Sequence, residues 1–279
     1  RRDNDGSDPI SLRMIASAAA PSTAFVLVTD AGYFPKAART IADLRAAGAW
    51  DGDVALLSVG FSPPRDFLDA ARVTCREVAH IDTDRLVAAL HEKPIRPMPD
   101  NRHFGKLVQW DKLQVFDPWI RQWERVIYLD AGLRVLDSVD ALLEVEWRGR
   151  LTAPDDALPG DNGKRFRCQI DLEADPAVRD RLLADFGAHI LDARYFLNCM
   201  WIVDTSLVDA CSCADLEDGM NRYPISLTNE MGIMNLYFHF RHRAWQPLPE
   251  RDARGKLIFG WSELNYPGTT WRDFRLLKY

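Results

Sequence analysis

The sequence has little of what marks several common protein classes. Its five cysteines are few and odd in number for 279 residues, so they predict no disulfide framework. Cys211 and Cys213 have no second pair to complete a zinc site. No apolar run approaches the roughly 20 residues that a membrane-spanning helix requires. We therefore expect a soluble fragment without a membrane span, a disulfide scaffold or structural zinc.

An excess of positive charge is also lacking. The chain has 35 Lys and Arg against 41 Asp and Glu, which gives a formal net charge of −6. General nucleic-acid binding depends on a basic face that neutralises phosphates. This charge balance therefore argues against nucleic acid as a partner.

The first residue is Arg1 and not a methionine. We therefore expect a preceding segment, in which a signal anchor could lie. The sequence leaves the localisation open between the cytoplasm and, with such an anchor, the Golgi lumen. It also leaves the oligomeric state open.

Strands and helices are predicted to alternate along most of the chain. Apolar runs of strand length lie at 24–29, 53–59, 73–81, 125–129, 151–153 and 196–203. Helical spacing is found at 36–47, 63–71, 84–90, 105–119, 177–186 and 230–240. This alternation predicts an α/β fold with a mainly parallel sheet flanked by helices. We expect residues 1–22 to be a flexible lead-in and residues 23–279 to form one domain.

The most informative strand is followed directly by a carboxylate. The run Arg125–Leu129 stops at Asp130, and open α/β sheets bind their ligands at the carboxyl ends of their strands. Asp130 is therefore a candidate site residue. The alternative is a strand-ending turn, in which Asp is common.

The segment DKLQVFDPWIRQWERVIYLDAGLRVLDSVDALL, residues 111–143, resembles the corresponding stretch of family 8 glycosyltransferases, which include glycogenin and bacterial lipopolysaccharide galactosyltransferases. Four further pieces follow the family's order: VTDAGY at 28–33, LTAPDD at 151–156, FLNCMWIVD at 196–204 and EMGIMN at 230–235. The resemblance spans most of the chain. It implies a GT-A fold and transfer of a sugar from a nucleotide sugar, such as a UDP- or GDP-sugar, to a glycan, lipid or protein acceptor. The nucleotide half would be about 23–150 and the acceptor half about 151–279.

The family's metal motif, Asp-x-Asp, is altered here. It reads Asp130-Ala131-Gly132, so the second carboxylate is absent. The family's metal-binding His precedes a late Trp by eight positions, and the same count back from Trp271 gives Glu263. Asp130 and Glu263 are therefore the tentative ligands for Mn²⁺ or Mg²⁺, and a metal-independent enzyme is the alternative.

The resemblance also implies residues that contact the donor and the reacting sugar. It assigns donor binding to Asp30, Tyr33, Lys112, Asp130, Gly132 and Asn198, and catalytic roles to Glu230 and Asp155. A cation such as Lys112 offsets the charge of a departing diphosphate. Ordinary alternatives are a solvated face for Lys112, a packed turn for Asp30 and Tyr33, and helix-dipole stabilisation by Glu230.

Two departures from the family bear on the activity. The family's late Lys-Pro-Trp reads Thr269-Thr270-Trp271, so a phosphate-contacting lysine is expected to be lost. Glu230 replaces a shorter Asp, which leaves retention or inversion of the anomeric configuration open. A catalytically inactive binder of nucleotide sugars or glycans is therefore an alternative function.

One other motif is interpreted as structural, and one loop bears on a rival function. Asp82-Thr83-Asp84 is a literal Asp-x-Asp, but it directly precedes a predicted helix, so we interpret it as a helix cap. The loop Asp30-Ala31-Gly32-Tyr33 lacks the glycine-rich character of a phosphate loop. A nucleotidyltransferase is therefore the weaker alternative.

Overall fold

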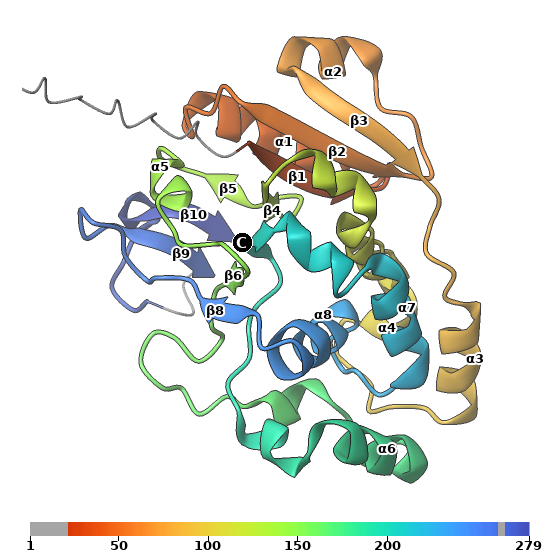
Figure 1. Cartoon of the computed structure of the whole chain (residues 1–279). Coiled ribbons are helices and arrows are strands. Elements are labelled where there is room, and N and C mark those ends of the chain that lie inside the picture. The colour runs from red at the N-terminus through yellow and green to blue at the C-terminus, as the bar shows by residue number, and fades with distance from the viewer. Residues whose placement is uncertain (1–21, 262–265, 279) are drawn as a thin grey trace, which may run out of the picture.

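The computed structural model describes residues 22–261 and 266–278, which form a central sheet, a smaller sheet and surrounding helices (Figure 1). The strands are β1 (Thr23–Thr29), β2 (Asp53–Val59), β3 (Val73–Val78), β4 (Arg125–Leu129), β5 (Arg134–Val135), β6 (Leu151–Ala153), β7 (Met200–Asp204), β8 (Trp245–Pro247), β9 (Leu257–Trp261) and β10 (Phe274–Lys278). The α-helices are α1 (Phe34–Ala46), α2 (Arg65–Ala71), α3 (Asp84–Glu92), α4 (Arg102–Gly105), α5 (Asp140–Leu143), α6 (Pro176–Phe186), α7 (Cys213–Arg222) and α8 (Glu230–Met234).

The large sheet has seven strands in the order β3-β2-β1-β4-β7-β6-β8. Strands β1 to β4 are mutually parallel, and β7 is antiparallel to both β4 and β6. This confirms the expected mainly parallel sheet. From β1 the chain moves to β2 and β3 on one side, whereas β4 lies on the other side. The strand order therefore reverses between β1 and β4, and sheets of this kind bind ligands beyond the carboxyl ends of the strands at such a point.

The second sheet orders its three strands as β5-β10-β9. Strand β10 is parallel to β9 and antiparallel to β5, which directly follows the loop after β4. Figure 1 shows this small sheet beside the carboxyl end of β4. The last strand of the described chain therefore lies next to the strand that ends at Asp130.

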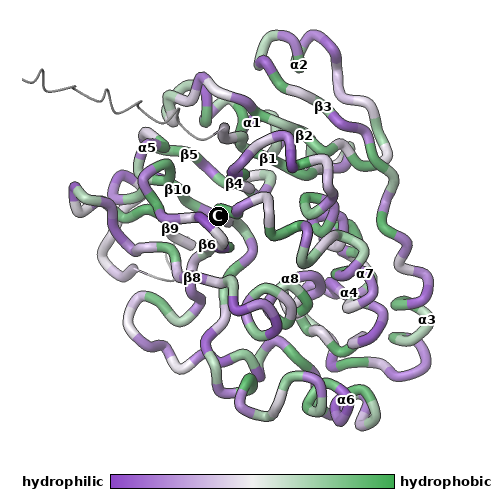
Figure 2. The backbone as a smooth tube through the Cα atoms, viewed as in Figure 1, coloured by the Kyte–Doolittle hydropathy of each residue, from purple (hydrophilic) through white to green (hydrophobic). Residues whose placement is uncertain are grey.

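Both faces of the large sheet are buried. Along β4, Val126 and Tyr128 pack on one face and Ile127 and Leu129 on the other, as strand alternation requires. One face is covered by α3, α6, α7, α8 and the 3-10 helix η1 (Leu107–Phe116), and the other by α1, α5 and the small sheet. In Figure 2 hydrophobic colour follows the central strands. This burial on both faces explains the nearly continuous apolar runs in the sequence.

Several expected elements differ from those observed. The predicted helix at 105–119 is instead η1 followed by a second 3-10 helix, η2 (Pro118–Gln122). The two are separated by Asp117, whose extended backbone (ψ 146°) is what a residue before proline favours. The predicted helix at 230–240 changes after α8 to a π-helix, η6 (Asn235–Arg241). The strand expected at 73–81 ends at Val78, and the one expected at 196–203 begins at Met200.

No helix among residues 22–261 and 266–278 is long and apolar enough to cross a membrane.

Candidate functional site

A buried cluster of charged side chains lies at the carboxyl end of β4. Lys112 on η1 places its Nζ 2.9 Å from Asp130 Oδ1, and Lys278 at the end of β10 places its Nζ 3.0 Å from Asp130 Oδ2. The Tyr128 hydroxyl also donates to Asp130 Oδ1, at 2.8 Å. The carboxylate is only 14% exposed, and both of its oxygens are bonded.

Lys112 also joins Asp130 to a residue in the second half of the chain, Glu230. Its Nζ lies 2.9 Å from Glu230 Oε1, at the first residue of α8. Asn198 Nδ2 donates to the same oxygen at 2.8 Å. Within the described ranges, Glu230 Oε2 is buried and has no hydrogen-bond partner. An unpaired buried carboxylate oxygen is costly unless a ligand supplies a donor.

The packing around the cluster keeps it away from water. Helix η1 buries Trp110 and Leu113 against the sheet, which directs Lys112 toward the end of β4. Tyr128 stacks on Trp201 with ring centroids 3.8 Å apart, so its hydroxyl is held at Asp130. A low-dielectric environment of this kind strengthens each ionic contact.

Asp130 and Glu230 share Lys112 but differ in their acidity. Burial raises the pKa of Glu230, because the single ammonium of Lys112 and the bond from Asn198 do not offset the loss of hydration. Burial opposes the ionisation of Asp130 as well, but Lys112 and Lys278 together outweigh it and lower its pKa. The second lysine therefore determines which carboxylate is the stronger acid.

The loop after β1 adjoins the loop after β4. Asp30 Oδ1 accepts the backbone N–H of Tyr33 at 2.8 Å, which is an Asx turn, and the Tyr33 ring is 41% exposed. Lys36 lies over that ring, 4.9 Å from its centroid. A Cβ added to Gly132 would meet Lys36 Cδ at 3.3 Å. No described bond joins these loop residues, Asp30, Tyr33 and Gly132, to the charged cluster.

Gly132 has a backbone that disfavours the family's second aspartate. Its φ is +89°, a conformation that L side chains rarely adopt, and its N–H donates to Thr40 Oγ1 at 3.0 Å. Backbone strain opposes a non-glycine residue here, and an added Cβ would also require the exposed Lys36 side chain to shift slightly. The local backbone therefore matches the Asp-Ala-Gly sequence.

Asp155 lies apart from the charged cluster. Its Oδ1 accepts the N–H of Ala157 and its Oδ2 the guanidinium of Arg194 at 3.1 Å, and its side chain has no exposed surface. Burial raises the pKa of Asp155, although the Ala157 bond and Arg194 oppose the effect. Both oxygens are therefore bonded within this loop region, and none of these bonds joins Asp155 to the charged cluster.

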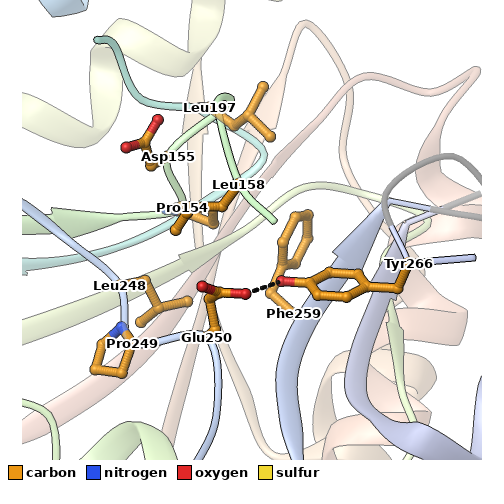
Figure 3. Close-up of a pocket in the computed structure, with 9 residues that line it drawn as sticks. All are labelled: Pro154, Asp155, Leu158, Leu197, Leu248, Pro249, Glu250, Phe259 and Tyr266. Atoms are coloured by element: carbon orange, nitrogen blue, oxygen red, sulfur yellow. Dashed lines mark hydrogen bonds between the residues drawn. The ribbon is translucent and has the colours of Figure 1, made fainter. Parts of the chain in front are cut away.

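Asp155 borders a pocket of about 330 Å³, including its open mouth, between the loop after β6 and the small sheet. The lining residues are Pro154, Asp155, Leu158, Leu197, Leu248, Pro249, Glu250, Phe259 and Tyr266. Tyr266 donates to Glu250 Oε2 at 3.2 Å. Figure 3 shows the Asp155 carboxylate turned away from this pair. The pocket therefore presents aromatic and aliphatic surface with one polar pair.

Sequence reasoning missed Lys278. The late Lys-Pro-Trp of the family is absent from the sequence, but β10 brings another lysine, Lys278, to Asp130. The signal in the sequence is weak, since a short strand ending in lysine is common. Only the pairing of β10 with β5 and β9 reveals its position.

The described residues fit a divalent metal poorly. Two unit charges about 4 Å apart interact by about 4 kcal/mol at an effective dielectric constant of about 20, so a divalent ion on Asp130 would meet strong repulsion from two ammonium groups. In residues 22–261 and 266–278 there is no group of three or more His, Cys, Asp or Glu side chains that could hold a metal. Glu263, the other tentative ligand, lies outside the described residues.

The literal Asp-x-Asp at Asp82–Asp84 behaves as a helix start. Asp82 Oδ1 accepts the backbone N–H of Asp84 at 2.9 Å, and both residues are exposed. Thr83 is the N-cap by position, but its side chain makes no capping bond. The bond to the first helical N–H is therefore made by Asp82, which directly precedes the N-cap residue.

No protein-family model matches the chain, and a search of curated proteins finds no significant relative. Solved structures do match. A galactosyltransferase, LgtC, in complex with donor and acceptor sugar analogues shares 14% identity over 92% of this chain and 86% of its own, with a TM-score of 0.56. The bifunctional glycosyltransferase WbbM shares 13% identity over 94% of this chain and 46% of its own, with a TM-score of 0.55.

A third match is core-mannan synthase A from Aspergillus fumigatus in a form with Mn and GDP, at 11% identity, a TM-score of 0.50 and coverage of 84% of this chain and 74% of its own. A divalent metal is thus present in one neighbour of the same fold. At these identities the likeness concerns architecture alone, and by that measure the chain has the GT-A fold found in glycosyltransferases.

Proposed function

We propose that the chain transfers a sugar from a nucleoside diphosphate sugar, with uridine or guanosine as its nucleoside, to a carbohydrate-bearing acceptor. The observation that carries this proposal is the Lys112 ammonium, held 2.9 Å from both Asp130 and Glu230 at the end of β4. A buried cation at the ligand-binding edge of such a sheet suits the charge that develops on a departing diphosphate.

The two halves of the chain would contribute different parts of this site. Lys112 and Asp130 come from the nucleotide half, about 23–150, whereas Asn198 and Glu230 come from the acceptor half, about 151–279. Asp30 and Tyr33 would hold the base beyond the carboxyl end of β1, with Tyr33 offering an exposed ring for stacking. The proposed reaction therefore takes place where the halves meet.

Glu230 is placed to orient a hydroxyl group. Lys112 and Asn198 fix Oε1, and the buried Oε2 is left to accept a hydrogen bond from a sugar hydroxyl. In the transfer, the acceptor oxygen bonds to the anomeric carbon, and the bond from that carbon to the β-phosphate oxygen breaks. The electron pair leaves on the nucleoside diphosphate, which also takes up the hydroxyl proton. Positioning of this kind accounts for large rate gains in group transfer.

A ligand screen tests the proposal directly. Thermal unfolding of the full chain is followed with UDP-, GDP- and thymidine diphosphate sugars, each with Mn²⁺ and with excess EDTA. A ligand that binds the native state raises its melting temperature by mass action. A selective shift with one donor, followed by its hydrolysis or transfer, would support the proposal and identify the donor.

The same screen distinguishes the proposed transferase from a catalytically inactive binder. The catalytically inactive alternative is favoured by Gly132, which lacks the carboxylate of the active family. Binding of one nucleotide sugar without turnover, across glycan acceptors, would establish that alternative. No shift with any donor under either condition would contradict the proposed transferase.

A further inference from the structure

Lys278 contacts the charged cluster at Asp130 Oδ2, whereas Lys112 contacts Asp130 Oδ1. Lys278 lies at the end of β10, whose Leu276 packs into the core between the sheets. Its Nζ contacts the Asp130 oxygen that Lys112 and Tyr128 leave free. One carboxylate therefore holds two ammonium groups that come from two different elements, the 3-10 helix η1 and strand β10 of the small sheet.

The two ammonium groups have donors to spare. A lysine carries three N–H donors. In the described contacts Lys112 uses one on Asp130 and one on Glu230, and Lys278 uses one on Asp130. Both side chains are largely buried, at 13% and 19% exposure. Three N–H groups thus remain for a ligand rich in anionic oxygens, and a carboxylate between them keeps the ammonium groups together.

We propose that Lys278 and Lys112 form a paired cationic site for the diphosphate of the donor, with Asp130 as the residue that positions both. This rests on the proposed function and deepens it. The bond from the anomeric carbon to the β-phosphate oxygen breaks with its electron pair on that oxygen. The two ammonium groups receive the new charge through hydrogen bonds, and no proton leaves them. The pair stands where a divalent ion would meet two like charges.

The charge of the cluster supports a ligand of this class. Two lysines and two carboxylates, Asp130 and Glu230, make the cluster formally neutral. A diphosphate adds negative charge beside two ammonium groups whose free donors face no other carboxylate in the described contacts. A metal cation is less well suited to Asp130 than a diphosphate is to the lysines, because both Asp130 oxygens already accept hydrogen bonds.

The test measures binding of UDP and GDP to the full chain by isothermal titration calorimetry in EDTA. Hydrogen bonds to charged groups contribute about 1.5–3 kcal/mol, so Lys278→Met should weaken the affinity roughly 10- to 100-fold. Lys278→Arg keeps the charge and should retain most of the affinity. Lys256→Met is the matched control, because Lys256 is paired with Asp137, 2.6 Å away and outside the cluster. It should bind like the parent chain.

A second titration assigns the effect to the diphosphate. Inorganic pyrophosphate should compete with UDP or GDP in the parent chain and lose this ability in Lys278→Met, whereas the free nucleoside should bind both proteins equally. Equal nucleoside diphosphate affinity in the parent and Lys278→Met would overturn the inference and leave the proposed function standing. So would binding that disappears in EDTA and returns with Mn²⁺. Failure of the parent chain to bind any nucleoside diphosphate in either condition would instead overturn the proposed function.

Discussion

The aspartates that follow strands β3 and β4 of the large sheet behave differently. Strand β3 lies at the edge of the sheet and is followed by Asp82 and Asp84, which are exposed and open a helix. Strand β4 lies in the middle and is followed by Asp130, which is buried between two lysines. The literal motif is at the first end and the charged cluster at the second. Position in the sheet and neighbouring cations therefore identify a candidate site residue better than a match to the Asp-x-Asp motif does.

The largest expected effect is a loss of turnover, and it compares the aspartates after β3 and β4 directly. Asp130→Asn removes the charge that holds Lys112 and Lys278 together, so turnover of the donor should fall by about 10²- to 10³-fold. Initial rates with the donor found in the screen provide the measurement. The double variant Asp82→Asn with Asp84→Asn is the control and should keep the parent rate. Similar losses in both proteins would remove the distinction between the strand ends.

A second variant tries to restore the motif at β4. Gly132→Asp places a side chain at φ +89° and against Lys36, so it should destabilise the fold by about 1–3 kcal/mol. It should also fail to create a dependence on Mn²⁺. Urea unfolding measures the stability, and Gly163→Asp is the matched control.

Gly163 has a φ of +78° and no atom within 4 Å of an added Cβ. The difference between the two variants therefore isolates the contact with Lys36 from backbone strain. A Gly132→Asp protein that is as stable as the parent and gains Mn²⁺-dependent turnover would contradict our interpretation of this loop.

A smaller effect is expected at the end of β3. Asp82→Ala removes the side chain that accepts the Asp84 N–H, so the free energy of unfolding should fall by about 1 kcal/mol, as for other lost helix caps. Catalytic rates should not change. Denaturant titration and initial rates check both statements, and a drop in rate beyond the loss of folded protein would give this end a functional role.

The smallest effect concerns pH. The pKa of Glu230 is raised in the folded chain, so above its ordinary value the folded state binds more protons than the unfolded state. Its contribution to stability is therefore lost as pH rises from about 4.5 through the folded pKa. Glu230→Gln lacks this titration, so its stability relative to the parent should improve as pH rises. Urea unfolding at several pH values measures the trend, and a constant difference between the two proteins would contradict it.

Much of the cluster could be predicted, because the resemblance to family 8 glycosyltransferases singles out Lys112, Asn198 and Glu230, and the end of a buried strand singles out Asp130. Asp130 follows a buried strand, Lys112 precedes it in an aromatic helical segment, and Asn198 and Glu230 adjoin apolar runs. The structure brings these four together. Asp155 is bonded instead by Arg194 and Ala157, and nothing local in the sequence reveals these partners. Its catalytic role stays a prediction.

Lys278 could not be found from local patterns. Its position depends on the pairing of β10 with β9 and with the two-residue strand β5, which is far away in the sequence. The 3-10 geometry of η1 was missed for a related reason, since its apolar residues satisfy helical spacing equally well. Tertiary contacts decided both cases.

Binding of a donor would also depend on whether the small sheet is folded. Because Lys278 belongs to β10, a molecule in which β5, β9 and β10 have opened would lack one of the two cations at Asp130 while its large sheet stayed intact. A bound nucleoside diphosphate would in turn protect the amide protons of β10 from exchange with solvent, because ligand and strand stabilise the same closed state. Folding of β10, the last described strand, and ligand binding would thus stabilise each other.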